Sequence, residues 1–331
     1  MRGVRPVPGA RAGEPRMGLL IAAFASIYLI WGSTYLAIRI AIETLPPFLM
    51  AATRFLVAGA ILWAYVWWIA RRVEPSRRPV IQPRHWRSTA LVGGLLLLGG
   101  NGGVVWAEQH VSSGLTAVMV AAVPIWMTLI EWLRPGGSRP SKGIVSGLTI
   151  GFIGIVLLVS SRGAVSHGAV TPTGASVLVL ACLAWSIGSI LSKHIAMPES
   201  PLAATAMQML CGGGLLLVPA AIAGDFRSLS LAEVSPRSLA ALAYLIVFGS
   251  LVAFSAYVWL LKVAAPARVG TYAYVNPVVA VLLGWGLANE PVTPRTLTAA
   301  GTILSGVAII TTLRGRDTRV AEAPRDSGSE T

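Results

Sequence analysis

Arg54 is the charged residue that lies deepest inside an apolar stretch of this chain. It stands about seven residues inside the apolar run 47–70, and an ionised side chain at that depth costs several kcal/mol unless it is paired or hydrated. We expect its guanidinium to face an internal cavity, where it could bind an anionic or carboxylate group. In the alternative interpretations, Arg54 extends toward the membrane surface or pairs with Glu43 or Glu108.

Two glutamates near the ends of apolar runs have the chemistry of a proton carrier. A carboxylate in a low-dielectric site has a raised pKa and can therefore take up and release a proton. Glu108 is the stronger candidate, although its position also suits a structural ion pair with Arg54 or Arg39. Glu131 lies three residues before Arg134, so an ion pair between these two residues explains it more simply.

Amides and aromatic rings could complete a binding cavity around these charges. Asn101 lies among glycines and Asn276 directly precedes Pro277, so each amide stands beside backbone that is open or bent. A small amphipathic molecule needs a mostly apolar wall with a few such polar groups. Tyr272 adds aromatic surface, while packing against lipid or core is the competing interpretation for any single ring. The predicted cavity residues are Trp31, Arg54, Asn101, Trp185, Gln208, Tyr257, Tyr274 and Asn276.

Motifs for enzymatic chemistry are missing from the sequence. It contains no G-x-x-x-x-G-K-[ST] loop, no H-E-x-x-H, no paired-cysteine motif and no G-x-S-x-G elbow. Both cysteines, Cys182 and Cys211, lie in apolar runs, which favours inert buried thiols over a disulfide or a metal site. We therefore expect neither an enzyme nor a bound metal or cofactor.

The composition is that of a membrane protein. Hydrophobic residues make up 55% of the chain, charged residues 12%, and the mean hydropathy is +0.71. A helix needs roughly twenty apolar residues to cross a bilayer core about 30 Å thick. Ten such runs predict an all-α, polytopic protein with ten transmembrane helices. The runs lie at about 18–38, 47–70, 88–108, 114–133, 143–160, 173–193, 201–223, 238–261, 267–287 and 296–313.

The distribution of Lys and Arg predicts the orientation. With the N-terminus inside, twenty of the 26 basic residues fall in cytoplasmic segments and five in outer ones, as expected from the positive-inside rule. This placement accounts for the net charge of +13 without a nucleic-acid partner. Both termini are predicted to be cytoplasmic, with 1–16 and 314–331 as disordered tails and the first apolar run as a retained span.

The second half of the sequence repeats the first. Residues between Trp31 and Leu62 recur at an offset of 154, and residues further on recur at 153; the clearest pairs are Trp31 with Trp185, Pro47 with Pro201, Trp106 with Trp259, and Pro124 with Pro277. The predicted units are 17–161 and 172–313. Since each holds five runs, the second must enter the membrane from the opposite side, and such inverted repeats are typical of secondary transporters.

Prolines and glycines within the runs predict where the helices bend and pack. Pro124 and Pro277 each free a carbonyl and can bend a helix, so we interpret them as hinges. Gly143, Gly147 and Gly151 share one helix face, as do Gly301 and Ser305. Small residues at this spacing indicate close helix contact, either within the chain or in a homodimer.

Three segments of the sequence resemble the EamA family of the drug/metabolite transporter superfamily, and within it the YedA-type exporters. They are IYLIWGSTYLAIRIAIETLPPFLMAATRF, GNGGVVWAEQHVSSGLTAVMVAAVPIW and GTYAYVNPVVAVLLGWGLANEPVT. The resemblance covers about 18–313 and includes both repeats. It implies a ten-span inner-membrane permease with cytoplasmic termini that exports small metabolites, amino acids or drugs, with an ion gradient as its energy source.

We therefore expect a secondary exporter of small solutes that works by alternating access, with Glu108 as the proton-coupling candidate. Two alternatives stay open at this point. One is an uncoupled facilitator, and the other is a membrane sensor or receptor without net transport. The sequence carries no attached soluble domain that would favour the sensor.

Overall fold

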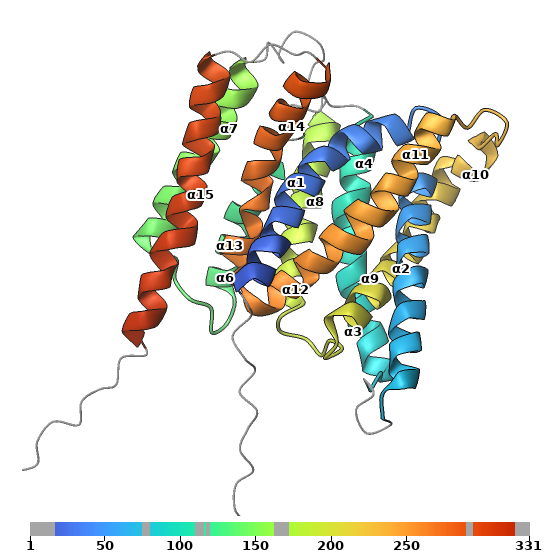
Figure 1. Ribbon diagram of the computed structural model, residues 1–331, viewed down its shortest axis with the longest axis horizontal. Helices are drawn as coiled ribbons and strands as arrows, with labels where there is room; N and C mark the ends of the chain where they lie inside the picture. The colour runs from blue at the N-terminus through green and yellow to red at the C-terminus, as the bar shows by residue number, and fades with distance from the viewer. Residues whose placement is uncertain are drawn as a thin grey trace, which may run out of the picture.

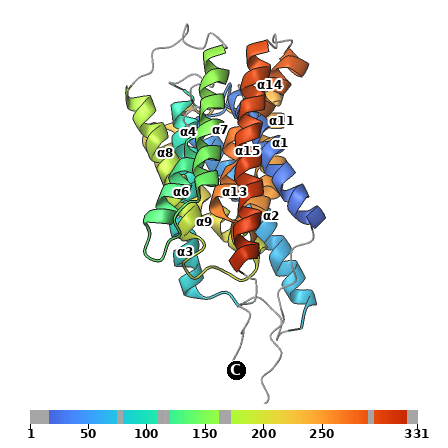
Figure 2. The ribbon, with the colours of Figure 1, turned by 90° about the vertical axis from the view of Figure 1, so that its left-hand side faces the viewer.

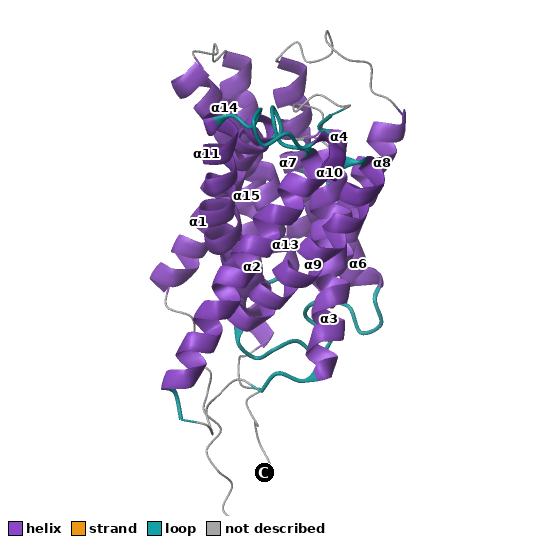
Figure 3. Ribbon diagram, turned by 90° about the vertical axis from the view of Figure 1, so that its right-hand side faces the viewer, coloured by secondary structure: helices purple, strands orange, loops and turns teal. Residues whose placement is uncertain are grey.

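The computed structural model describes residues 17–74, 80–109, 116, 120–161, 172–288 and 294–321. All regular structure within these residues is helical, which confirms the predicted all-α class (Figure 3). In chain order the helices are α1 Met17–Ala41, α2 Pro47–Arg72, α3 Pro83–Gly93, η2 Gly94–Gly102, α4 Gly103–Ala107, α6 Val123–Leu133, α7 Lys142–Ser161, α8 Pro172–Leu191, α9 Pro201–Ala223, α10 Asp225–Ser228, α11 Pro236–Tyr244, η3 Leu245–Phe254, α12 Ser255–Val263, α13 Pro266–Gly270, α14 Tyr272–Ala288 and α15 Pro294–Ala321.

Six helical segments of the described residues are long and apolar enough to cross a membrane. They are Met17–Ala41, Pro47–Arg72, Pro83–Ala107, Thr173–Leu191, Pro201–Ala223 and Pro236–Val263. Shorter apolar helices lie at Val123–Leu133, Lys142–Gly154 and Leu297–Ile310. The predicted tail 1–16 lies outside the described residues. The last helix continues to Ala321, beyond residue 313 at which the sequence predicts its end.

Several helices begin at a proline, which is favourable there because its missing N–H would have no partner in the first turn. Ser200 and Ser235 also cap α9 and α11 by accepting the N–H groups of Ala203 and Ser238. Helix α2 has no such cap of its own. Instead, the Asp225 carboxylate accepts the N–H of Leu49 at 2.9 Å, so the second half of the chain caps a helix of the first.

The two halves of the chain are interlocked (Figure 1). Helix α1 packs against α14, α11, η3 and α12 of the second half, whereas α8 packs against η2, α6 and α4 of the first. Side-chain hydrogen bonds join α1 to its neighbours, including Tyr28 to Thr271 (2.6 Å) and Ser33 to Tyr244 (2.6 Å). The first helix of each half therefore completes the other half.

Helices α2 and α9 meet through contacts that mirror each other. A Cβ on Gly59 would lie 3.0 Å from the Leu210 side chain, and a Cβ on Gly213 would lie 3.1 Å from the Leu56 side chain. Gly59 corresponds to Gly213, and Leu56 to Leu210, at the sequence offset of 154. Such an exchange of partners is the signature of a two-fold relation.

Helices α7 and α15 lie side by side at one edge of the bundle (Figures 1 and 2). Glycines allow their backbones to approach closely, because a Cβ on Gly306 would meet the Gly147 carbonyl oxygen at 2.7 Å and the Gly151 nitrogen at 2.6 Å. The predicted glycine face thus serves packing within the chain. Gly301, by contrast, is exposed and has open space around it.

The third long helix of each half contains a wider π-helical stretch. In the first half η2 lies between α3 and α4, and in the second η3 lies between α11 and α12. Pro83 and Pro236 begin these helices at the sequence offset of 153. A π-helical turn holds an additional residue and is frequent at functional sites.

Helix α1 begins and α15 ends toward the same end of the bundle, which we call the termini end (lower part of Figure 1). The opposite end, where α1 ends and α10 lies, is called the far end. Helix α1 therefore runs from the termini end to the far end. These directions place the residues of the site along the bundle.

Candidate functional site

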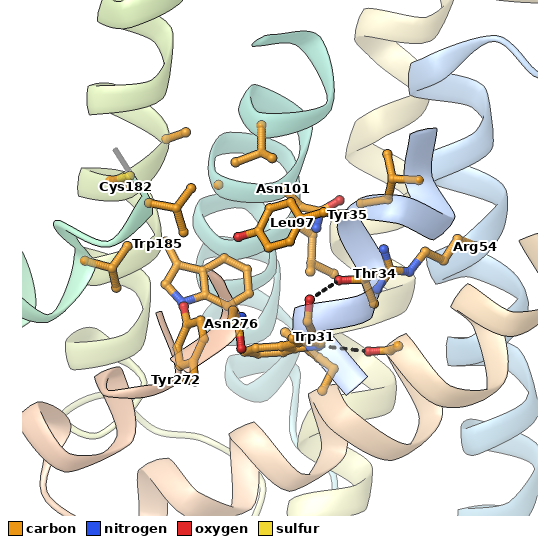
Figure 4. Close-up of a pocket in the computed structure, with 18 of the residues that line it drawn as sticks. Trp31, Thr34, Tyr35, Arg54, Leu97, Asn101, Cys182, Trp185, Tyr272 and Asn276 are labelled. Atoms are coloured by element: carbon orange, nitrogen blue, oxygen red, sulfur yellow. Dashed lines mark hydrogen bonds between the residues drawn. The ribbon is translucent and has the colours of Figure 1, made fainter. Parts of the chain in front are cut away.

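A cavity lies in the centre of the bundle, between the two halves (Figure 4). It holds about 690 Å³ of space, including its opening. Helices α1, α2, η2, α4, α8, η3 and α14 all contribute to its wall. The lining residues are Trp31, Thr34, Tyr35, Ile38, Arg54, Phe55, Leu97, Gly100, Asn101, Val104, Val120, Val123, Ala181, Cys182, Trp185, Gly249, Phe254, Tyr272 and Asn276.

Aromatic rings fill the side of the cavity nearest the termini end. The Trp31 ring meets the rings of Trp185 (5.7 Å between centroids) and Tyr272 (4.8 Å) edge-on, and it lies 5.1 Å from that of Tyr257. Such edge-to-face contacts are favourable and hold the rings in fixed orientations. Along α1, Trp31 lies one turn closer to the termini end than Tyr35, so these rings form a floor beneath the cavity.

A closed set of hydrogen bonds fixes one ring of this floor. The Trp185 indole N–H donates to the Tyr257 hydroxyl (2.8 Å), which lies 2.5 Å from the Ser189 hydroxyl. Ser189 in turn donates to the Trp185 carbonyl (2.6 Å). The indole of Trp31 donates to the Gly249 carbonyl of η3 (3.2 Å). Each tryptophan of the wall is therefore held by a partner on the third helix of the second half.

Arg54 lies on the cavity wall and is only 4% exposed. Its Nε donates to the Ser250 hydroxyl (2.8 Å), and its Cζ lies 4.7 Å from the centre of the Phe55 ring. No carboxylate of the described residues lies within ion-pair distance of it. The alternative pairing with Glu43 is not formed, since Glu43 faces Arg237 at 3.9 Å.

Two amides also lie on the wall. The Oδ1 atom of Asn101 is buried and accepts no hydrogen bond from the described residues. Asn276 is 2% exposed, and its amide nitrogen, once turned to face them, reaches the carbonyls of Tyr272 (3.0 Å) and Tyr28 (3.1 Å). Asn276 therefore ties α14 to α1, whereas Asn101 keeps an unused acceptor.

Glu108 lies just beyond the cavity, toward the far end. Its backbone N–H donates to the carbonyl of Val104, a lining residue one turn earlier, so the carboxylate continues the face that carries Asn101 and Val104. Both of its carboxylate oxygens are buried and accept no hydrogen bond from the described residues. Its nearest charged neighbour is Arg39 of α1.

Three of the predicted cavity residues do not line this cavity. Tyr257 lies directly behind the wall, as described above. Gln208 is 1% exposed, and its backbone carbonyl packs against Gly93 of α3. Tyr274 packs against Gly151 of α7 and donates to the Leu148 carbonyl (3.2 Å). The remaining five, Trp31, Arg54, Asn101, Trp185 and Asn276, all lie on the wall.

The two predicted hinge prolines lie in different settings. Pro277 lies inside α14, where it interrupts the backbone hydrogen bonds. Pro124 lies in the first turn of α6, where a proline is compatible with the helical backbone. Gly270, seven residues before Pro277, packs against Pro124, because a Cβ on Gly270 would lie 3.2 Å from the Cα of Pro124.

Several lining residues were not predicted from the sequence. On α1, Thr34, Tyr35 and Ile38 follow Trp31 by three, four and seven residues, which is the spacing of one helix face. On α8, Cys182 precedes Trp185 by three residues. The helical spacing around the two duplicated tryptophans is thus a signal in the sequence that indicates these lining residues.

Comparison with known proteins assigns the chain to a family. The profile of the EamA-like transporter family matches residues 16–160 and 172–312. The chain belongs to the EamA-like transporter family. The inner-membrane transporter YedA of Escherichia coli K12 is 39% identical, over 88% of this chain and 90% of YedA. The resemblance drawn from the sequence is confirmed, and the chain is a transporter-family protein and not an enzyme.

More distant relatives have the same length of match. The transporter YoaV of Bacillus subtilis is 25% identical, over 85% of this chain and 93% of YoaV. One solved crystal structure is similar with a TM-score of 0.71 and 21% identity, and the match covers 91% of this chain and 100% of the solved one. That likeness shows that this chain and the solved structure share a fold.

Proposed function

We propose that this EamA-like protein is a secondary exporter of small organic solutes that works by alternating access. The observation that carries the proposal is the central cavity, which is lined by helices from both halves and floored by aromatic rings toward the termini end. Rocking of one interlocked half against the other would break this floor and expose the cavity to the other side. Pro277 and Pro124 are our hinge candidates.

The proposed arrangement has ten spans in two inverted sets of five, in the inner membrane, with both termini in the cytoplasm. Support comes from the basic side chains at the termini end, such as Arg71 and Arg72 in the last turn of α2 and Lys142 at the start of α7. Arg71 and Arg72 stack on Trp67 and Trp68, at 3.3 and 3.8 Å from the ring centres. Aromatic rings beside arginines are typical of a membrane interface.

Glu108 is the proposed proton carrier. Its buried carboxylate lies between the cavity face of α4 and Arg39 at the far end, on the route that a solute would take to leave. Coupling to the proton gradient needs a carboxylate near the solute that each side of the membrane can reach in turn. The position of Glu108 one turn beyond the cavity meets this condition.

The test begins with metabolites in the medium of cells that overexpress or lack the gene, and the enriched compound is then used as substrate. In proteoliposomes, an imposed pH gradient should accelerate its flux through the wild type. Glu108→Gln should abolish this acceleration, because the amide cannot lose a proton, while Glu43→Gln, an exposed control, should keep it.

Each other outcome argues for a different mechanism. Flux that does not respond to the pH gradient in the wild type would indicate an uncoupled facilitator. A response that survives in Glu108→Gln would remove Glu108 from the coupling step. No flux of any enriched compound would contradict the proposed transport and favour a sensor.

A further inference from the structure

We infer that the solute held in this cavity is an organic monoanion with a flat apolar body. Zwitterions and cations lie outside this substrate class. The inference rests on the proposed function, since it names what the transporter binds. Three observations support it: the charge of the wall, the setting of the Arg54 guanidinium, and the chemistry of the remaining surface.

The described wall carries one side chain that is charged at neutral pH, and it is Arg54. None of the lining residues is Asp, Glu or Lys. A solute with one negative charge therefore neutralises the cavity, whereas a cation adds a second positive charge to it. Because like charges repel strongly where water is scarce, the wall disfavours cations whatever their shape.

The Arg54 guanidinium is held in place but not neutralised. Ser250 accepts from Nε, Phe55 lies beneath the group, and Gly249 leaves room beside Nη2, because a Cβ there would lie only 2.8 Å from that nitrogen. The terminal nitrogens have no partner among the described residues. They are the two donors with which an arginine binds a carboxylate in a bidentate manner.

The carboxylates that could neutralise Arg54 from within the described chain have other partners or lie off the wall. Glu43 faces Arg237 and Glu131 binds Arg134 at 2.8 Å. Glu108 lies beyond the wall, where Arg39 is its nearest cation. A buried guanidinium without a carboxylate is unfavourable in the empty protein, so a bound anion would recover that energy.

The rest of the wall fits an apolar body. The rings of Trp31, Trp185 and Tyr272 present flat surfaces below the guanidinium, and Figure 4 shows them grouped on the side opposite Arg54. The unused amide of Asn101 adds an acceptor for a neutral donor. A zwitterion would bring an ammonium group as well, and no carboxylate on the described wall could bind it.

A matched series of probes tests the charge preference. The probes are 3-phenylpropanoate, 3-phenylpropanamide, 3-phenylpropylamine and phenylalanine, which share the ring and chain but are negative, neutral, positive and zwitterionic at neutral pH. Radiolabelled probes are measured by equilibrium dialysis with the purified protein in detergent. The carboxylate should bind about tenfold or more tightly than the amide, as expected for a charge-assisted hydrogen-bond pair.

Three variants test whether Arg54 is the source of the preference. Arg54→Gln should bind carboxylate and amide equally, while Arg71→Gln, which also loses one positive charge but lies at the exposed end of α2, should retain the preference. Arg54→Lys, which keeps the charge, should retain part of it and serves if the glutamine variant does not fold. A carboxylate that binds no better than the amide to the wild type, whatever the affinity, overturns the inference, as does a preference that survives in Arg54→Gln.

Flux measurements separate this inference from the proposed function. Preferred binding of the carboxylate without flux in proteoliposomes would contradict transport and leave the charge selectivity standing. Flux of the amine or of phenylalanine at the rate of the carboxylate would support transport and contradict the inference that the solute is a monoanion.

Discussion

Tyr257 lies behind the cavity wall and its hydroxyl holds the Trp185 ring in place. The hydroxyl accepts the Trp185 N–H and contacts Ser189; Tyr257 and Ser189 are fully buried, and Trp185 is partly buried. Tyr257→Phe should therefore leave a buried donor without a partner, at a cost of about 1–3 kcal/mol. We expect a lower melting temperature in detergent and slower flux, because the Trp185 ring loses its fixed orientation.

Tyr65→Phe is the matched control for this substitution. Tyr65 is 48% exposed on α2 and its hydroxyl makes no hydrogen bond with the described residues, so its loss should change neither melting nor flux. A Tyr257→Phe protein that melts and transports like the wild type would show that the hydrogen-bonded set does not support the floor.

At the scale of residues, the sequence indicates where a side chain lies when its charge restricts the possible locations. It does not indicate this when the rotation of the helix decides which way the side chain faces. A charged residue deep in an apolar run has few places to lie, and Arg54, which we expect from the sequence to face a cavity, lies on a cavity wall. Tyr272 and Tyr274 are two residues apart, so about 200° of rotation separates them and both cannot face one cavity. Tyr272 faces it and Tyr274 faces α7.

Gln208 shows why duplication does not predict a second lining residue. Its pairing with Arg54 at the offset of 154 suggested that both would line the site. Gly93 and Gly212 instead let α9 approach α3 so closely that the Gln208 backbone is in contact with Gly93. Local glycines, and not the repeat, determine that α9 packs on α3 and contributes no residue to the described cavity wall.

At the scale of helices, α15 provides a pair of glycines for a direct test. Gly306→Ala would place a methyl group against the Gly147 and Gly151 backbones, which cannot move aside as a flexible side chain can. Overpacking of this kind costs about 1–3 kcal/mol, so we expect a clearly lower melting temperature by size-exclusion analysis after heating.

Gly301→Ala lies on the same helix with open space around it. It should melt at the wild-type temperature or slightly above it, because alanine favours the helical backbone. Equal melting of the two variants would contradict the close packing of α7 on α15.

Helix positions were readily predicted from the sequence, because twenty apolar residues in a row have few alternatives to a membrane helix. The long helices α1, α2 and α9 begin within one residue of their predicted starts. The sequence could not show that Pro124 begins a helix, since a proline is compatible with both a first turn and an internal bend. Only the backbone conformation of the neighbouring residues distinguishes a first turn from an internal bend.

At the scale of the whole molecule, the common location of both chain ends permits a test of orientation. In a protein without cysteines, Glu74→Cys marks the termini end and Glu233→Cys marks the connection between α9 and α11 at the far end; both native residues are exposed. A membrane-impermeant maleimide should label Glu233→Cys in intact spheroplasts and Glu74→Cys only after lysis.

This outcome follows from the excess of Lys and Arg at the termini end. The reverse pattern of labelling would place the N-terminus outside and contradict the proposed direction of export. Labelling of both sites in intact spheroplasts would contradict the proposed number of spans between them.

The π-helical stretches η2 and η3 restrict where residues can be inserted into the chain or deleted from it. One residue added or removed there would rotate the rest of the helix by about 100°, and in the first half that rotation would carry Val104 and Glu108 away from their present face. The offset between the halves changes from 154 to 153 before Pro83 and Pro236 and holds through Trp106 and Trp259. The length difference between the duplicates thus lies ahead of these helices, and each copy has a π-helical stretch at nearly the same position.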